Sequence, residues 1–317
     1  MWQRREVTRM VGLVPVMFFV AQVGPASGHD EESAAPPSIE QFVGSTPCDV
    51  LPQRFLGILN SPACERITWQ LTLSKNRQAG HPGTYNLQAI YGMQMQGAAG
   101  FVSGGTAVQL HGTWSLVNGS KTNPDVLVYR IRAEEPARSM QFAKMGDNLL
   151  HLLNEDKSLM IGNASWSYTL NRVGRAPNPH TQRLFEADVS EGATVAGIFE
   201  GRSPCQAIAR QLNAGMTSDC TKLKWRLTLL ADSSGRPASY KLEGTLYRDA
   251  PRTGKLTILT EPRTKAVIYR LNRDQPGGFL SLFKADDNIL FFLDERGAFL
   301  TGDVYYSYTL NRIAGSS

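Results

Sequence analysis

The chain has 317 residues, of which 42% are hydrophobic and 19% charged. This composition is typical of globular proteins and excludes disordered, collagen-like and coiled-coil chains. The formal net charge is +5, and it falls to +3, from 30 basic and 27 acidic residues, when the first 28 residues are left out. That excess is too small and too scattered for a nucleic-acid groove, so we expect no nucleic-acid partner.

Residues 1–28 predict a secretory signal peptide. A basic start is followed by the apolar stretch 10–22 and by small residues at Ala26 and Gly28. The apolar stretch is shorter than the about 20 residues of a membrane-spanning helix, and Pro15 interrupts it. We therefore expect cleavage near Gly28 and an exported, soluble mature chain with no stable membrane span.

The chain beyond the leader contains one unit twice. Phe42–Cys48 aligns with Phe199–Cys205, and Ser165–Arg172 aligns with Tyr305–Arg312 at the ends of the two copies. Matches of this length indicate an internal duplication. The first copy carries insertions, mostly around Gly92–Ala107.

The duplication predicts two domains. We expect a flexible polar tail at 29–40, a first domain at 41–173, a linker at 174–192 and a second domain at 193–314. Each copy is large enough to form a hydrophobic core of its own.

Four cysteines occur as two pairs at equivalent positions of the copies. In an exported protein an even number predicts disulfides, and four cysteines allow three pairings. A duplicated unit favours a bridge inside each copy, so we predict Cys48–Cys64 and Cys205–Cys220. Each bridge closes a loop that contributes about 3 kcal/mol in the chain-entropy model. Neither pair has the two-residue spacing of redox motifs and zinc knuckles.

Alternating apolar and polar residues, rich in β-branched and aromatic side chains, predict strands at equivalent places in both copies. These strands are expected at 69–73, 84–91, 126–131, 165–172, 225–229, 240–247, 267–271 and 305–312. Clusters of Gly, Pro, Asn and Asp separate them, which favours an antiparallel barrel or sandwich. The segments between the cysteines, 50–59 and 206–213, predict short helices.

The order of these features resembles the N-terminal domain of the copper-resistance lipoprotein NlpE family. The shared pattern is an aromatic-Gly-Pro-Cys start, a Trp-x-Leu-Thr-Leu strand, an Asp-Asn turn and a closing Tyr-Thr-Leu-Asn-Arg. The matching residues are Gly44, Pro47, Cys48, Tyr85, Leu153, Tyr168, Leu170 and Arg172 in the first copy, and Gly201, Pro204, Cys205, Tyr240, Leu293, Asp294, Gly297, Tyr308, Leu310 and Arg312 in the second. The chain lacks the Cys-x-x-Cys spacing and the lipidation cysteine of that family.

This resemblance implies an all-β protein made of two tandem, small, antiparallel lipocalin-like β-barrels. It also implies a periplasmic or secreted location in a Gram-negative-type envelope, and a role in envelope stress sensing or copper tolerance. In such a barrel a terminal arginine closes one end against an aromatic ring. We therefore expect cation–π closure of the barrels by Arg172 with Trp69 and by Arg312 with Trp225.

Candidate metal ligands occur in the first copy alone. Met93 and Met95 are two residues apart, which places two thioethers on one face of a strand, and such soft ligands suit Cu(I). Met145 and His151 are also absent from the second copy and complete the candidate copper site. His151 replaces a phenylalanine on a strand face that we expect to point into the barrel. The alternative is that these methionines fill an irregular core.

The glycine-rich segment 97–105 is expected to form a lid or an exposed loop with Phe101 at its tip. No pair of histidines has metal-ligand spacing, and no catalytic motif is found, so we expect no enzyme. Three functions remain. The first is a non-catalytic envelope protein that binds an envelope protein partner through two modules. The second is copper binding, and the third is the transport of a small apolar ligand inside a barrel.

Overall fold

The structure, a computed structural model, describes residues 39–59, 61, 63–75, 83–134, 138–174, 185–187, 194–215, 219–271 and 279–313. The signal peptide predicted at 1–28 lies outside the described residues, as does most of the tail predicted at 29–40. β1 begins at Ile39, so the last two residues of that predicted tail belong to the first domain. Glu40 is buried there because ion pairs with Lys75 and Arg172 neutralise its carboxylate.

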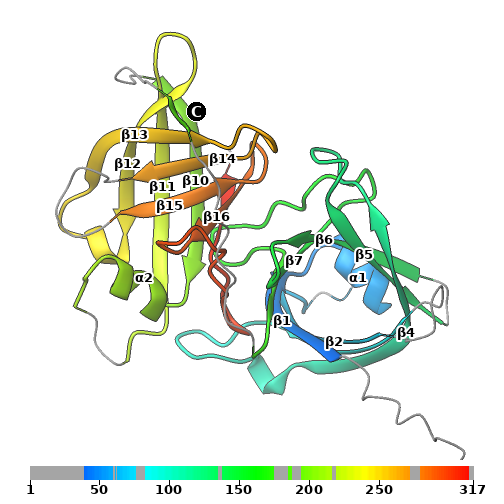
Figure 1. Ribbon diagram of the computed structural model, residues 1–317. Helices are drawn as coiled ribbons and strands as arrows, with labels where there is room; N and C mark the ends of the chain where they lie inside the picture. Colours follow the sequence, from blue (N-terminus) through cyan, green and yellow to red (C-terminus); the bar gives the residue numbers. More distant parts are fainter. Residues whose placement is uncertain are drawn as a thin grey trace, which may run out of the picture. The chain divides into compact units, whose positions relative to one another are not determined.

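Within the described part of the first copy, eight antiparallel strands close into a barrel (Figure 1). Each strand pairs with its neighbours in sequence, and β1 pairs with β8 to close the barrel. The strands are β1 (Ile39–Pro47), β2 (Arg66–Ser74), β3 (Gly83–Gly92), β4 (Thr106–Asn118), β5 (Leu127–Ala133), β6 (Arg138–Met145), β7 (Leu149–Leu152) and β8 (Thr169–Arg172).

The described residues of the second copy repeat this order from β10 to β17, and pairing of β12 with β13 closes the second barrel. The strands are β10 (Thr194–Ser203), β11 (Leu223–Ala231), β12 (Pro237–Gly244), β13 (Arg252–Thr260), β14 (Val267–Leu271), β15 (Leu280–Lys284), β16 (Ile289–Leu293) and β17 (Thr309–Ile313). The prediction of two tandem antiparallel barrels is therefore confirmed.

The segment predicted as a linker contains a further strand, β9 (Phe185–Ala187). β12 pairs only with the first part of β13, up to Lys255, which leaves the edge at Ile258–Thr260 open. β9 pairs with that edge. An open strand edge presents unpaired backbone groups, so a passing segment is readily added to it.

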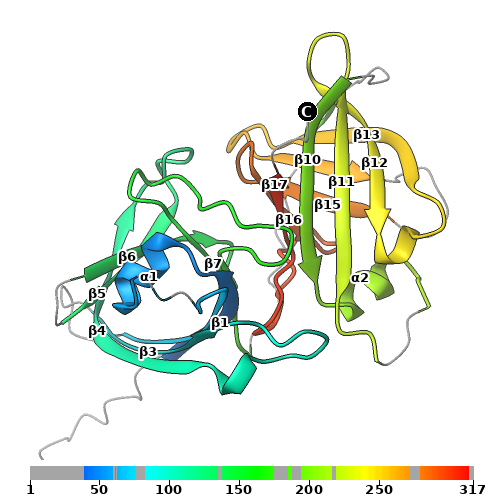
Figure 2. The same ribbon diagram turned by 180° about the vertical axis from the view of Figure 1, so that it is seen from behind.

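Both predicted disulfides are present. The Cα atoms of Cys48 and Cys64 are 5.7 Å apart, and those of Cys205 and Cys220 are 6.1 Å apart. Each bridge holds a short helix, α1 (Val50–Leu56) or α2 (Gln206–Gln211), at one end of its own barrel (Figure 2). Among the described residues, no helix is long and apolar enough to cross a membrane.

Each barrel has its own core. The first is filled by side chains that include Trp69, Tyr85, Phe142 and Tyr168, all at most 3% exposed. The second contains the equivalent Trp225 and a similar set of aromatic and leucine side chains. Large side chains therefore occupy the space in which a wider barrel would hold a ligand.

Three predicted strands begin later or end earlier than expected. Residues 165–168 precede β8 as a turn, because the Asn163 side chain accepts hydrogen bonds from the backbone N–H groups of Ser165 and Trp166. Asp303 forms the same turn before β17. β12 ends at Gly244, and a 3₁₀ turn, η2 (Thr245–Tyr247), follows it; the other 3₁₀ turn is η1 (Val102–Gly104). An Asn or Asp side chain that satisfies local N–H groups competes with strand pairing.

Candidate functional site

Equivalent residues of the two copies contact each other. The hydroxyl oxygens of Ser167 and Ser307 are 2.6 Å apart, and those of Thr169 and Thr309 are 3.0 Å apart. Both pairs are separated by 140 residues, the offset between the copies in this region. Pairing of a residue with its own counterpart is the signature of approximate two-fold symmetry. We call this contact between the barrels the seam.

Two buried asparagines bind across the seam in a reciprocal way. The Asn311 side-chain oxygen accepts a hydrogen bond from Gly162 N at 2.9 Å, and its amide group donates to the carbonyl of the next residue at 3.2 Å. The Asn171 side chain makes the matching bonds to Gly302 N, at 2.8 Å, and to the following carbonyl, at 3.0 Å. These four bonds satisfy backbone groups that the barrels alone leave unpaired.

Apolar side chains complete the seam and correct the prediction for His151. Leu150 and Leu152 point into the first barrel, whereas Leu149 and Leu153 belong to a separate cluster with Ile289 and other residues of the second barrel. His151 lies on the same strand face as Leu149 and Leu153. It therefore points out of the first barrel, against the second barrel. The prediction failed because the outer face of β7 is also covered, so both faces of the strand are apolar.

The imidazole of His151 is fully buried and fully engaged. Its Nδ1 atom lies 2.9 Å from Thr169 Oγ1, its Nε2 atom lies 2.9 Å from the carbonyl oxygen of Met160, and its ring meets Phe291 edge to face. Phe291 is the counterpart of His151 in the second copy. Burial lowers the pKa of His151 to about 4. Neither ring nitrogen is available to a metal ion in this arrangement.

The four predicted copper ligands are not brought together. Met93 and Met95 are 46% and 43% exposed in the loop after β3, where they flank Gln94. Met145 ends β6, which runs antiparallel to β3, so it lies at the opposite end of the barrel. In the described ranges, no three His, Cys, Asp or Glu side chains are placed to hold a metal ion.

The terminal arginines have other partners than the predicted tryptophans. Arg172 lies 6.0 Å from the ring centroid of Phe42, its neighbour across the β1–β8 pair, and forms an ion pair with Glu40 at 3.1 Å. Arg312 instead donates to two backbone carbonyls, at 3.2 and 2.8 Å. The strand register decides this, because it places the arginine beside Phe42 and the tryptophan beside Gly44.

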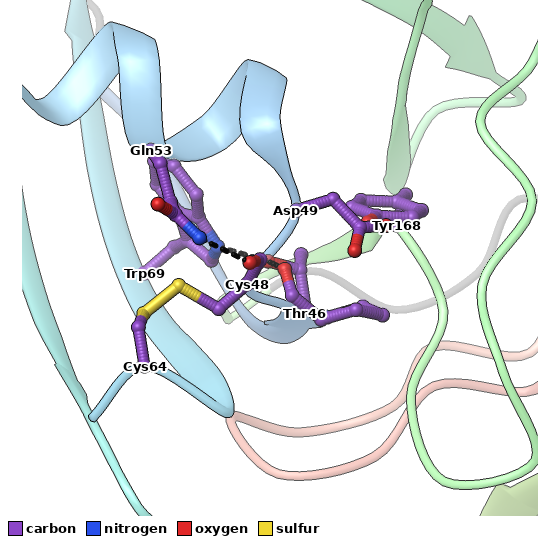
Figure 3. Close-up of a disulfide and its surroundings, with 8 residues drawn as sticks. Thr46, Cys48, Asp49, Gln53, Cys64, Trp69 and Tyr168 are labelled. Carbon is purple, nitrogen blue, oxygen red and sulfur yellow. Dashed lines mark hydrogen bonds between the residues drawn. A yellow bond between two sulfur atoms is a disulfide. The ribbon is translucent and has the colours of Figure 1, made fainter. Parts of the chain in front are cut away.

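The tryptophans belong to the disulfide ends of the barrels. Trp69 Nε1 donates to Thr46 Oγ1 at 2.8 Å, and the Gln53 amide donates to the carbonyl oxygen of Cys48 at 2.6 Å (Figure 3). Tyr168 donates its hydroxyl hydrogen to the carboxylate of Asp49. Burial, helped by that carboxylate, raises the pKa of Tyr168 above its ordinary value.

At the disulfide end of the second barrel, residues of both copies line a groove of about 640 Å³. We call it the disulfide groove. The second copy contributes the Cys205–Cys220 bridge and side chains from α2 and the turn before β17, and the first copy contributes Arg66 and part of the loop after β3. The charged and aromatic lining residues are Arg66, Arg210, Lys222, Asp303, Tyr305, Tyr306 and Tyr308.

Arg66 is the most unusual residue of the disulfide groove, because only 1% of it is exposed. Its guanidinium carbon lies 4.3 Å from the ring centroid of Phe101, 5.8 Å from that of Trp166 and 5.9 Å from that of Tyr305. One guanidinium nitrogen donates to the carbonyl of Gly100 at 3.2 Å, but Nε has no acceptor among the described residues. Burial lowers the pKa of Arg66.

Phe101 therefore lies under a guanidinium and is 7% exposed, which corrects the prediction that it forms an exposed loop tip. The loop after β3 folds back because Gln94 pairs with Phe101 as an isolated bridge. A glycine-rich sequence does not reveal whether a cation elsewhere will bind the single aromatic residue that it carries.

Lys222 is the counterpart of Arg66 in the second copy. Its ammonium nitrogen lies 5.8 Å from the ring centroid of Tyr306, which is the counterpart of Trp166. Sequence reasoning missed this repeated cation–aromatic pair. The sequence pattern that could have revealed it has two parts. A basic residue stands two positions after the second cysteine of each copy, and an aromatic residue stands two positions before Tyr168 or Tyr308.

No family model matches the chain, and no curated protein or solved structure matches it either. The candidate site is therefore defined by its geometry.

Proposed function

We propose that this protein is a non-catalytic, exported binding protein of NlpE-like type whose two barrels hold one ligand or envelope partner in the disulfide groove. The observation that carries this proposal is the repeated cation–aromatic pair, Arg66 with Trp166 and Lys222 with Tyr306. Both cations line the same groove. Both copies contribute residues to this site, so one barrel alone could not form it.

The cellular part of the proposal is surface sensing or copper tolerance in a Gram-negative-type envelope, in the periplasm or outside the cell. The NlpE-like order of features supports it. Two disulfides support it as well, because they form and persist in oxidising compartments.

Growth across a series of copper concentrations, together with an envelope-stress reporter, tests this role in a Gram-negative host that expresses the full chain. Ala207→Trp places a bulky ring in the disulfide groove. Val50→Trp makes a comparable change at the equivalent position of α1 and serves as the matched control. We expect Ala207→Trp to abolish the response and Val50→Trp to retain it. Equal responses of the native chain and Ala207→Trp would contradict the proposal.

The transport of an apolar ligand inside a barrel is a weaker alternative. Trp69, Phe142 and Tyr168 are at most 1% exposed and pack together with leucines in the interior of the first barrel. A ligand of ordinary size would have to displace these side chains, at a cost of several kcal/mol for cavity formation.

Copper binding by Met93 and Met95 is a second candidate function, which rests on the exposure of both thioethers on either side of Gln94. Anaerobic titration of residues 29–317 with Cu(I) against a chromophoric competitor tests it. One equivalent that is lost in Met93→Ala/Met95→Ala would support a thioether site. Binding that is absent, or unchanged by the two substitutions, would exclude one.

A further inference from the structure

We propose that the ligand of the disulfide groove carries an oxyanion, a carboxylate or phosphate group, on an aromatic or apolar body. This inference rests on the proposed function and adds the chemical class of the ligand. Its basis is a concentration of cations, Arg66, Arg210 and Lys222, around a groove whose acidic lining residue is Asp303.

Arg66 carries a buried positive charge. A buried cation is costly unless a counter-charge and hydrogen-bond acceptors compensate it. In the described part of the chain no carboxylate lies within ion-pair distance of Arg66, and the aromatic rings around it compensate its charge only partly. Nε still lacks an acceptor. An oxyanion in the groove would supply both the charge and the acceptor.

A second polar group of the groove is also unsatisfied. Thr301 Oγ1 is buried and has no hydrogen-bond partner among the described residues. Thr301 and Arg66 come from different barrels and line the same groove. Of the buried side-chain atoms without partners in the described residues, these two line the groove, and a ligand group bound there would give both of them a partner.

The body of the ligand follows from the rest of the lining. Tyr305 and Tyr306 lie at the groove beside the cations, and their rings offer flat apolar surfaces. A volume of about 640 Å³ is far larger than one phosphate ion needs and falls in the range of small-molecule sites. The ligand is therefore an organic anion.

Two further cations, Lys222 and Arg210, line the groove beside Arg66. Arg210 is exposed on α2, and Lys222 is half-buried. Neither of them forms an ion pair within 4 Å in the described part of the chain, in contrast to Arg54 of α1, which binds Glu155. Unpaired cations at a concave surface attract an anion and orient it.

Titration of the full chain with 1-anilinonaphthalene-8-sulfonate, an aromatic oxyanion that fluoresces when bound, tests this inference. Its uncharged analogue N-phenyl-1-naphthylamine is the second probe. Arg210→Gln/Lys222→Gln removes two charges from the groove and leaves buried Arg66 in place. Arg54→Gln/Lys121→Gln removes two charges from exposed ion pairs of the first barrel and is the matched control.

We expect one equivalent of the sulfonate to bind, with at least a tenfold higher Kd in Arg210→Gln/Lys222→Gln and a change of less than twofold in the control. We also expect the Kd to rise with ionic strength. Phenyl phosphate and benzoate then distinguish the two sources of the oxyanion by which of them displaces the probe. If neither displaces it, the inference is wrong.

Two further outcomes separate this inference from the proposed function. If both probes bind equally well and Ala207→Trp displaces both, the groove binds ligands but does not select anions, so the inference fails and the proposed function stands. If Ala207→Trp leaves the binding of the sulfonate unchanged, the groove is not the binding site and both proposals fail.

Discussion

The seam and the disulfide ends of the barrels have changed to different extents since the duplication. At the seam, Ser167 faces Ser307 and Thr169 faces Thr309, so the two copies are identical at these two hydrogen-bonded positions. A hydroxyl that hydrogen-bonds its own counterpart loses this bond if either copy changes, so both copies are held to the same residue at these positions. The seam therefore preserves the symmetry of the repeat.

The disulfide ends have no such constraint, and their charges have diverged. A hollow at the first end is lined by the carboxylates of Asp49, Glu155 and Asp156 and by the single cation Arg54. The disulfide groove at the second end has three cations and one carboxylate. The hollow at the first end is therefore mainly acidic, and the disulfide groove, to which the first copy contributes Arg66, is mainly basic, whereas the hydroxyl pairs between the barrels are identical in the two copies.

Removing either of the reciprocal asparagines should cause one of the largest losses of stability, because each one binds two backbone groups of the other barrel. Each of Asn171→Ala and Asn311→Ala leaves two seam backbone groups unpaired, so we expect each to lower the free energy of unfolding by about 3 kcal/mol. Denaturation in urea measures this loss. Asn118→Ala, at an exposed position, should change it by less than about 0.5 kcal/mol and serves as the control. Similar values for all three variants would show that the seam does not stabilise the protein.

Removing each disulfide tests whether the two bridges contribute equally to the stability of the protein. The bridges span 16 and 15 residues, so their loops constrain the unfolded chain to the same extent. We expect Cys48→Ser/Cys64→Ser and Cys205→Ser/Cys220→Ser each to cost about 3 kcal/mol. Only the second pair lines the groove, so only its removal should also weaken binding of the aromatic sulfonate. Equal weakening by both would contradict the assignment of the site.

At the seam, His151 packs against its counterpart Phe291, and this difference between the copies predicts a dependence of stability on pH. In the unfolded chain the imidazole of His151 has its ordinary pKa of 6.5. In the folded protein, burial lowers this pKa to about 4. Stability is therefore greatest above pH 6.5, falls as the pH drops through this window, and levels off below about pH 4. The loss is about 3 kcal/mol at most.

Urea denaturation between pH 7 and pH 4 measures this dependence. His151→Phe, the residue of the second copy, should abolish most of the slope, although it also leaves the Met160 carbonyl without its partner. His111→Phe removes an exposed histidine and should retain the slope. An unchanged slope in His151→Phe would show that another group causes the dependence.

The closing arginines should show the smallest effects, and these should differ between the copies. Arg172→Ala removes one of the two ion-pair partners of buried Glu40 and leaves Lys75, so we expect it to cost about 2 kcal/mol. Arg312→Ala removes hydrogen bonds from an exposed side chain and should cost less than about 1 kcal/mol. Thermal unfolding of the two variants measures the difference, and a larger loss in Arg312→Ala would reverse this ranking.

Much of the fold was predictable from the sequence, but little of the site was. The strand predicted at 69–73 lies inside β2, and that at 225–229 lies inside β11, because their alternation reports an inner and an outer face. Arg66 escaped prediction because nothing near it in sequence shows that Phe101, Trp166 and Tyr305 surround it. The predicted copper ligands failed to assemble for the opposite reason, since Met145 and Met93 share a copy but lie at opposite ends of its barrel.

The sequence by itself determined the duplication, the antiparallel strands and the pairing of the cysteines. These features depend on alternation and spacing within short stretches, where neighbours in the chain are also neighbours in space. Only the tertiary structure decided that the barrels meet along the seam, that His151 faces outward and that cations from both copies line one groove. Contacts between residues 140 positions apart obey no local pattern, because they depend on which outer faces are buried against each other.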